Sequence, residues 1–190
     1  DDILFTQIFN QRGRYDVGTG LMDGSTGIDV SGSLFSVNEY TDFSFAYDLA
    51  IGIFDPQSNR SFAYGAPLVS NSQDNQGAIY TLHSRDSGYV QGATIFGDEV
   101  DNAIGIQLST LTRLNASADT LVIGGYNDLT YRDFSVGGPR LDVPLPANDL
   151  FIGFGLAIAS TPSSDGTYQM WVSGLSEVGG ESRVWIMSAR

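Results

Sequence analysis

Residues 61–68 (SFAYGAPL) and residues 77–82 (GAIYTL) are the stretch that decides how this chain folds. The first run is apolar and stops at Gly-Ala-Pro, and the second contains β-branched and aromatic residues. Between them, residues 69–76 are rich in Ser, Asn, Gln and Asp, which favour turns. A strand, a turn and a second strand in this order predict a β-hairpin.

Weaker copies of this hairpin recur twice downstream. Residues 121–125 (LVIGG) and 170–174 (MWVSG) are apolar runs that end in small residues, and residues 183–187 (RVWIM) follow the second run. Another apolar segment precedes each run at a constant spacing. That spacing is 20 residues, measured from Phe45 to Gly65, from Ile104 to Gly124 and from Phe154 to Gly174. The regularity predicts one supersecondary unit used three times, in residues 43–92, 93–149 and 150–190.

The composition favours a single all-β domain over residues 1–190. Of the 190 residues, 42% are hydrophobic, which is enough to fill a substantial core. The apolar runs are short, and no stretch keeps a 3.6-residue apolar period over several turns. We therefore expect propeller-like repeats of short antiparallel strands, with a β-sandwich or jelly roll as the alternative. Closed propellers generally need at least four blades, which residues 1–42, rich in Gly and Asp, could complete.

The charge of the chain limits its partners. Twenty-two acidic residues face nine basic ones, all of them Arg, and the formal net charge is −13. Nucleic acid and anionic membrane surfaces both need basic patches, so neither is an expected partner. No apolar run approaches 20 residues, so membrane insertion is not expected. The chain has no Cys, which excludes thiolate metal sites and cysteine nucleophiles.

Two motifs resemble the FG-GAP repeat, the blade unit of the integrin α-subunit β-propeller and of many secreted bacterial proteins. They are Phe154-Gly155 leading into residues 156–158 (LAI), and residues 64–67 (YGAP) leading into residues 77–80 (GAIY). The resemblance covers roughly residues 43–188. It implies a β-propeller, an extracellular or cell-surface location, and an adhesion role. It also implies Ca²⁺ in acidic loops, where Asp165, followed by Gly166, is the best remnant of the family's calcium loop.

A second candidate for Ca²⁺ comes from the residues themselves. Four oxygen-bearing side chains, those of Asp98, Glu99, Asp101 and Asn102, lie within five residues directly after a Gly. Calcium prefers several oxygen ligands from one loop, so this group could bind the ion. A solvated acidic turn is the alternative interpretation.

Candidate partner-binding residues lie further along the chain. Tyr126, Asp128, Tyr131 and Arg132 fall in a segment that we interpret as a loop, and Tyr and Arg are enriched at interfaces. These residues are the predicted contact surface for a protein or a glycan. The single histidine, His83, makes a His-rich zinc site impossible and is interpreted as an ordinary loop or strand-end residue.

The sequence therefore predicts a non-catalytic binding or adhesion module that is extracellular or on the cell surface. One alternative is a structural subunit of a filament, coat or capsid that self-assembles through β-strand contacts. Another is an extracellular hydrolase that uses two carboxylates.

Overall fold

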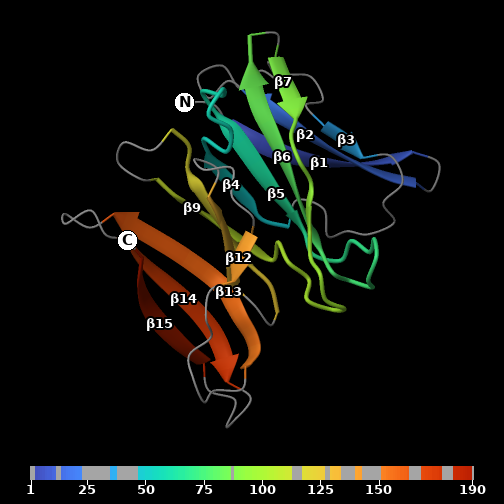
Figure 1. The fold of residues 1–190 in the computed structure, drawn as a ribbon. Coiled ribbons are helices and arrows are strands. Elements are labelled where there is room, and N and C mark those ends of the chain that lie inside the picture. The colour runs from blue at the N-terminus through green and yellow to red at the C-terminus, as the bar shows by residue number, and fades with distance from the viewer. Residues whose placement is uncertain are drawn as a thin grey trace.

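The chain is all-β, as the sequence predicts. In the computed structural model, the described residues are 3–11, 14–22, 35–37, 47–86, 88–112, 117–126, 129–133, 140–142, 151–162, 168–176 and 182–189. They form small antiparallel sheets (Figure 1), and among them there is no helix long and apolar enough to span a membrane.

The first sheet uses three strands in the order β1-β2-β3. Its strands are β1 (Ile3–Gln11), β2 (Arg14–Met22) and β3 (Phe35–Val37). β1 contains the apolar residues Ile3, Leu4, Phe5, Ile8 and Phe9. β2 is nine residues long although it lies in the Gly-rich part of the chain. Its pairing with β1 along its whole length explains why its glycines do not interrupt it.

The central sheet has the order β4-β5-β6-β7, and β8 also pairs with β6. Its strands are β4 (Leu49–Gly52), β5 (Ser61–Ala66), β6 (Ala78–Arg85), β7 (Gly88–Gln91) and β8 (Ile95–Phe96). β5 and β6 pair antiparallel from Ser61 opposite His83 to Ala66 opposite Ala78, which confirms the hairpin predicted first.

The third sheet has the order β12-β11-β10-β9, and the fourth has the order β13-β14-β15. Their strands are β9 (Gln107–Leu111), β10 (Thr120–Gly124), β11 (Leu129–Asp133), β12 (Arg140–Asp142), β13 (Phe151–Pro162), β14 (Tyr168–Ser176) and β15 (Ser182–Ala189). In Figure 1 the sheet of β13, β14 and β15 lies at the bottom, away from the β6–β7 turn at the top.

Strand pairing matches the predicted 20-residue spacing in the third segment, where Phe154 lies opposite Gly174. In the first two segments the glycine contacts the residue 17 positions before it. Gly65 exchanges backbone hydrogen bonds across to Tyr47 and Asp48, both at 2.9 Å, and Gly124 pairs with Gln107. Asp48 and Gln107 precede their glycines by the same number of residues. Register shifts interrupt the β13–β14 ladder on both sides of the Phe154–Gly174 pair.

No propeller is detected among the described residues. β6 pairs with β8, which comes from the second predicted segment, and Gly77 forms a parallel bridge with Ile104. The central sheet is therefore not a separate blade built from one segment alone. Short antiparallel strands in small sheets are the part of the prediction that the structure confirms.

The core lies on both faces of the β5–β6 hairpin. All six residues of β5 are buried. On one face the apolar side chains belong to the central sheet and its adjoining loop. On the other face, side chains of the central and third sheets pack together: Ala50, Phe54, Ala63, Ile79, Ile95, Ile104, Leu108, Leu121 and Ile123. One hairpin thus anchors two sheets.

Two carboxylates join the central and third sheets. Leu108 N–H donates to Asp48 Oδ2 at 2.7 Å, and Ile53 N–H donates to Asp119 Oδ2, also at 2.7 Å. Thr110 Oγ1 donates to the carbonyl oxygen of Ile51 at 2.9 Å. These contacts satisfy the Ile51 carbonyl of β4, the Ile53 N–H directly after β4 and the Leu108 N–H of β9.

Candidate functional site

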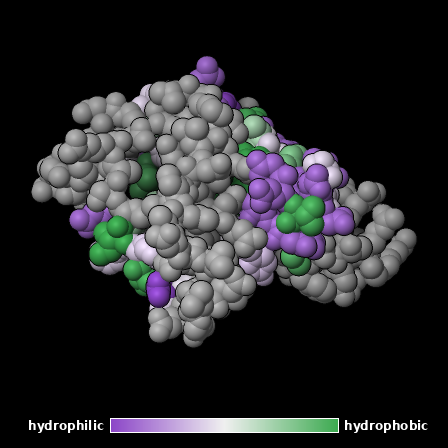
Figure 2. All heavy atoms as spheres, turned by 60° about the horizontal axis from the view of Figure 1, so that its bottom comes forward, coloured by the Kyte–Doolittle hydropathy of each residue, from purple (hydrophilic) through white to green (hydrophobic). Residues whose placement is uncertain are grey.

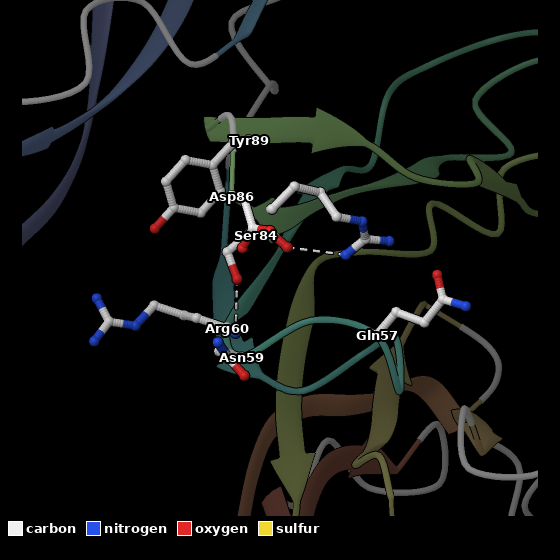
Figure 3. A pocket seen from close by; sticks show the side chains of 7 residues that line it. Gln57, Asn59, Arg60, Ser84, Asp86 and Tyr89 are labelled. Atoms are coloured by element: carbon white, nitrogen blue, oxygen red, sulfur yellow. Dashed lines mark hydrogen bonds between the residues drawn. The ribbon is translucent and has the colours of Figure 1, made fainter.

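The candidate site is a cavity of about 410 Å³ between the β4–β5 loop and the β6–β7 turn (Figure 3). The loop contributes Gln57, Asn59 and Arg60, all of them exposed. The strand β6 and its turn contribute Ser84, Arg85 and Asp86, and β7 contributes Tyr89. Polar and charged side chains thus make up most of the wall.

The loop on one side of the cavity is a hydrogen-bonded turn, as the sequence Asp55-Pro56-Gln57-Ser58 favours. Ser58 N–H donates to the carbonyl oxygen of Asp55 at 2.9 Å, and Gln57 N–H donates to Asp55 Oδ1 at 2.8 Å. The turn holds Gln57 at the rim of the cavity. In Figure 3, Gln57 and Arg60 extend in opposite directions from this loop.

Two serine hydroxyls fasten the loop to β6. Ser84 N–H donates to the carbonyl oxygen of Arg60 at 2.9 Å and to Ser58 Oγ at 3.1 Å. In return, Arg60 N–H donates to Ser84 Oγ at 3.0 Å, the contact drawn beside Asn59 in Figure 3. The backbone at the cavity floor is therefore held before any ligand arrives.

An ion pair braces the cavity from the side. Arg85 Nη2 donates to Asp55 Oδ2, and Arg85 Nη1 donates to the carbonyl oxygen of Ser84 at 2.9 Å. The pKa of Asp55 lies below its ordinary value, chiefly because Gln57 N–H hydrogen-bonds its carboxylate, with Arg85 contributing. Asp55 thus stays charged and links the loop to β6.

Tyr89 forms the aromatic part of the wall. Its ring packs against Phe62, with ring centroids 5.4 Å apart and planes inclined by 40°. Phe62 is fully buried, so it fixes the orientation of the Tyr89 ring. The cavity therefore combines a fixed aromatic ring with exposed amide, carboxylate and guanidinium groups.

His83 and Ser61, which adjoin the lining residues Ser84 and Arg60 in the sequence, form a buried pair. His83 Nδ1 is 2.9 Å from Ser61 Oγ, which also accepts a hydrogen bond from Phe54 N–H at 3.1 Å. Burial lowers the pKa of His83 below its usual 6.5, although the Asp55 carboxylate acts in the opposite direction. Ser61 is completely buried, so its hydroxyl cannot reach a substrate in this structure. The pair fastens β5 to β6 instead. His83 lies within β6, so its interpretation as a loop or strand-end residue is wrong.

The predicted acidic calcium group lies elsewhere. Asp98, Glu99 and Asp101 are exposed, whereas Asn102 is buried. Asp101 Oδ1 accepts a hydrogen bond from Asn75 Nδ2 at 2.8 Å, which joins two neighbouring loops. In the part of the chain that the structure describes, no three His, Cys, Asp or Glu residues are grouped to hold a metal ion. Asp165 lies outside the described residues, and calcium binding stays a prediction.

The predicted contact residues are only partly placed. Tyr126 is exposed and lines a second cavity of about 340 Å³, together with Tyr47 and Leu68. Tyr131 and Arg132 lie in β11, paired with Val122 and Leu121, so their assignment to a loop is wrong. The five-residue strand β11 lies in a segment whose Gly and Pro residues suggested a loop. Asp128 lies outside the described residues.

Sequence reasoning missed the residues of the cavity. Its members come from a turn and from the β6–β7 hairpin, and the sequence predicted no strand at residues 88–91. One signal was available, because two of only nine Arg residues, Arg60 and Arg85, flank the predicted hairpin. Because Arg is scarce in so acidic a chain, both positions could have been chosen as candidate site residues.

We compared the chain with protein-family models and with curated proteins. No protein-family model matches the chain, and no curated protein matches it. The resemblance to FG-GAP repeats therefore rests on the two motifs quoted above.

Proposed function

We propose that this chain is a non-catalytic binding module of the extracellular medium or cell surface, and that the cavity beside Tyr89 binds a carbohydrate. The observation that carries the proposal is the lining of the cavity. Asn59, Gln57 and Asp86 offer planar amide and carboxylate groups, and each can bond two neighbouring hydroxyl groups of a sugar. Tyr89 offers a ring face for the apolar side of the sugar.

The braced walls support binding of a ligand that needs a fixed geometry. The Asp55–Arg85 ion pair and the Ser58–Ser84 contact hold both sides of the cavity in place. Binding then does not have to order the loop, and preorganisation of this kind raises affinity. A volume of about 410 Å³ lies in the range of small-molecule sites.

Binding is favoured over hydrolysis by the chemistry of the lining. Glycoside hydrolysis generally needs two carboxyl groups that flank the bond. Among the described lining residues, Asp86 is the one carboxylate, and the nearby Asp55 is paired with Arg85. A hydrolase remains the weaker proposal.

The repeat interpretation belongs to the same proposal. We interpret residues 43–92, 93–149 and 150–190 as FG-GAP-like, propeller-related units of an adhesion module. The motifs at residues 64–67 and at Phe154-Gly155 support this interpretation. The alternative, a subunit of a filament or coat that assembles through strand contacts, is favoured by the exposed edge described in the next subsection.

The test is a binding screen against immobilised neutral and acidic oligosaccharides, followed by titration calorimetry of those that bind. We expect Asn59→Ala and Asp86→Ala each to weaken binding by about tenfold, since each change removes hydrogen bonds to the ligand. Gln73→Ala, an exposed residue outside the cavity, is the matched control and should bind as the parent protein does. If no oligosaccharide binds, or if Asn59→Ala and Asp86→Ala leave the affinity unchanged, the proposal is wrong.

A further inference from the structure

Among the described strands, β15 is an edge strand of the fourth sheet. It pairs with β14 from Tyr168 opposite Ala189 to Leu175 opposite Ser182. Among the described strands, β14 is its one partner, since β15 ends the order β13-β14-β15. An edge of this kind presents a row of backbone N–H and C=O groups that can pair with another strand.

The side chains next to this edge are apolar and exposed. Val184 and Ile186 are each 67% exposed, and Trp171, which lies opposite Ile186 in the ladder, is 45% exposed. The alternate residues of β14, Met170 and Val172, are buried, so the sheet covers the core with one face only. Figure 2, which brings the bottom of the molecule forward, shows hydrophobic surface on the side where β14 and β15 lie in Figure 1.

The charge of the strand indicates which partner fits it. The whole chain carries a net charge of −13, so two copies repel each other over most of their surfaces. Residues 182–189 (SRVWIMSA) contain no acidic residue, no Gly and no Pro, and carry one positive charge, on Arg183. Two copies that meet at this edge therefore bring no carboxylate of the paired strands against each other. High β-propensity with low charge is also the sequence pattern of strands that self-pair.

We propose that two copies of this chain associate by pairing β15 of one with β15 of the other, antiparallel, so that one sheet continues across both molecules. A two-fold axis at Trp185 places Val184 of each copy opposite Ile186 of the other. In that register Arg183 lies opposite Met187, so no like charges face each other. The exposed apolar side chains of both copies then form one strip, to which Trp171 adds on the neighbouring strand.

This interface is independent of the proposed carbohydrate site. The cavity lies at the β6–β7 turn, at the opposite end of the molecule from β15 in Figure 1. Either proposal can fail without the other.

The test is sedimentation equilibrium of the chain over a range of concentrations, at low and high NaCl. We expect a monomer–dimer equilibrium that strengthens as salt screens the net charge. Because both Trp residues of the chain, Trp171 and Trp185, lie in β14 and β15, their quenching by acrylamide should fall as the dimer forms.

Ile186→Lys should raise the dimer dissociation constant by at least about tenfold, because it places a charge at the centre of the strip. Ile186→Thr keeps the β-propensity and should weaken the dimer less. Val100→Lys, at another exposed apolar position, is the matched control and should dimerise as the parent does. The proposal is overturned if the parent stays monomeric up to about 1 mM, if Ile186→Lys dimerises as tightly as Val100→Lys, or if β15 pairs only with a different protein.

Discussion

The β5–β6 hairpin and the β14–β15 hairpin share one strand pattern, an apolar run that ends in small residues, yet their surroundings differ. Both faces of the β5–β6 hairpin are covered, so Tyr64 and Ile79 are fully buried. The β14–β15 hairpin covers the core with Met170 and Val172 but exposes Trp171 and Ile186. The same strand pattern therefore supports an enclosed hairpin in one place and an open one in another.

Small side chains account for the difference. Ala63, Ala66 and Ala78 are fully buried in β5 and β6, and they let neighbouring backbone come close. At Gly65 the approach is closest, because a Cβ there would lie 1.8 Å from the carbonyl oxygen of Gly105. Gly105 itself has a φ of +91°, a conformation that glycine adopts readily. In β14 and β15, bulky side chains occupy the exposed face instead. Whether a hairpin is covered on both faces thus depends on the size of its side chains. The alternation of hydrophobic and polar residues does not indicate that size.

The two hairpins should differ most in how much the free energy of unfolding falls when one isoleucine of each is replaced by alanine. Ile79→Ala should lower the free energy of unfolding by about 2–5 kcal/mol, because it leaves a cavity in the core that the two sheets share. Ile186→Ala should change the same quantity by no more than about 0.5 kcal/mol, because Ile186 is mostly in solvent. Urea unfolding of both variants, at a concentration too low for association, measures the difference. Equal losses would contradict the contrast between an enclosed and an open hairpin.

A smaller effect is expected from the carboxylate that ties the third sheet to β4. Asp119 is buried, its Oδ2 accepts the Ile53 N–H, and its own N–H donates to the Ile53 carbonyl oxygen at 2.7 Å. Asp119→Ala should cost about 1–3 kcal/mol of unfolding free energy, because the Ile53 N–H loses its acceptor in a partly buried place. The exposed Asp98 is the control, and Asp98→Ala should stay within about 0.5 kcal/mol. If both variants unfold at the same urea concentration, Asp119 does not join the sheets.

The sequence predicted the elements better than it predicted their environment. The β5–β6 hairpin and the pairing of β14 with β15 could be predicted because apolar runs that end at small residues are local signals. β7 was not predicted because its four residues, Gly88–Gln91, are too few and too polar to show a strand-like hydrophobic pattern. They form a strand by pairing with β6.

The candidate cavity could not be predicted from spacing. Asp55 and Arg85 are 30 residues apart, and their ion pair forms only because β5 brings the loop onto the end of β6. Likewise, Asp98 and Asp101 are close in sequence, but Asp101 is engaged by Asn75 from a different loop. Contacts of this kind depend on the register of a sheet, and a single sequence does not report that register.

The smallest effect should be a pH dependence that belongs to the enclosed hairpin alone. His83 is buried in β6, and burial holds its pKa below the usual 6.5, whereas residues 168–176 and 182–189 contain no histidine. When the pH falls below 6.5, the unfolded chain takes up a proton at His83 before the folded chain does. Proton binding therefore stabilises the unfolded state and lowers the free energy of unfolding. The stability from the neutral histidine is therefore fully present above pH 6.5 and is lost as the pH falls through the folded pKa. Asp55, whose pKa lies below 3.8, adds a further loss only at still lower pH.

Urea midpoints between about pH 8 and pH 5.5 measure this dependence, and His83→Gln should remove most of the slope in that window. Amide hydrogen exchange places the effect in the structure. As the pH is lowered, and after correction for the intrinsic pH dependence of exchange, protection should decrease in β5 and β6 first, because Ser61 and Thr81 both contact the imidazole. If the urea midpoint of His83→Gln still changes with pH as steeply as that of the parent, the pH dependence comes from the many carboxylates. It would then not be a property of the β5–β6 hairpin alone.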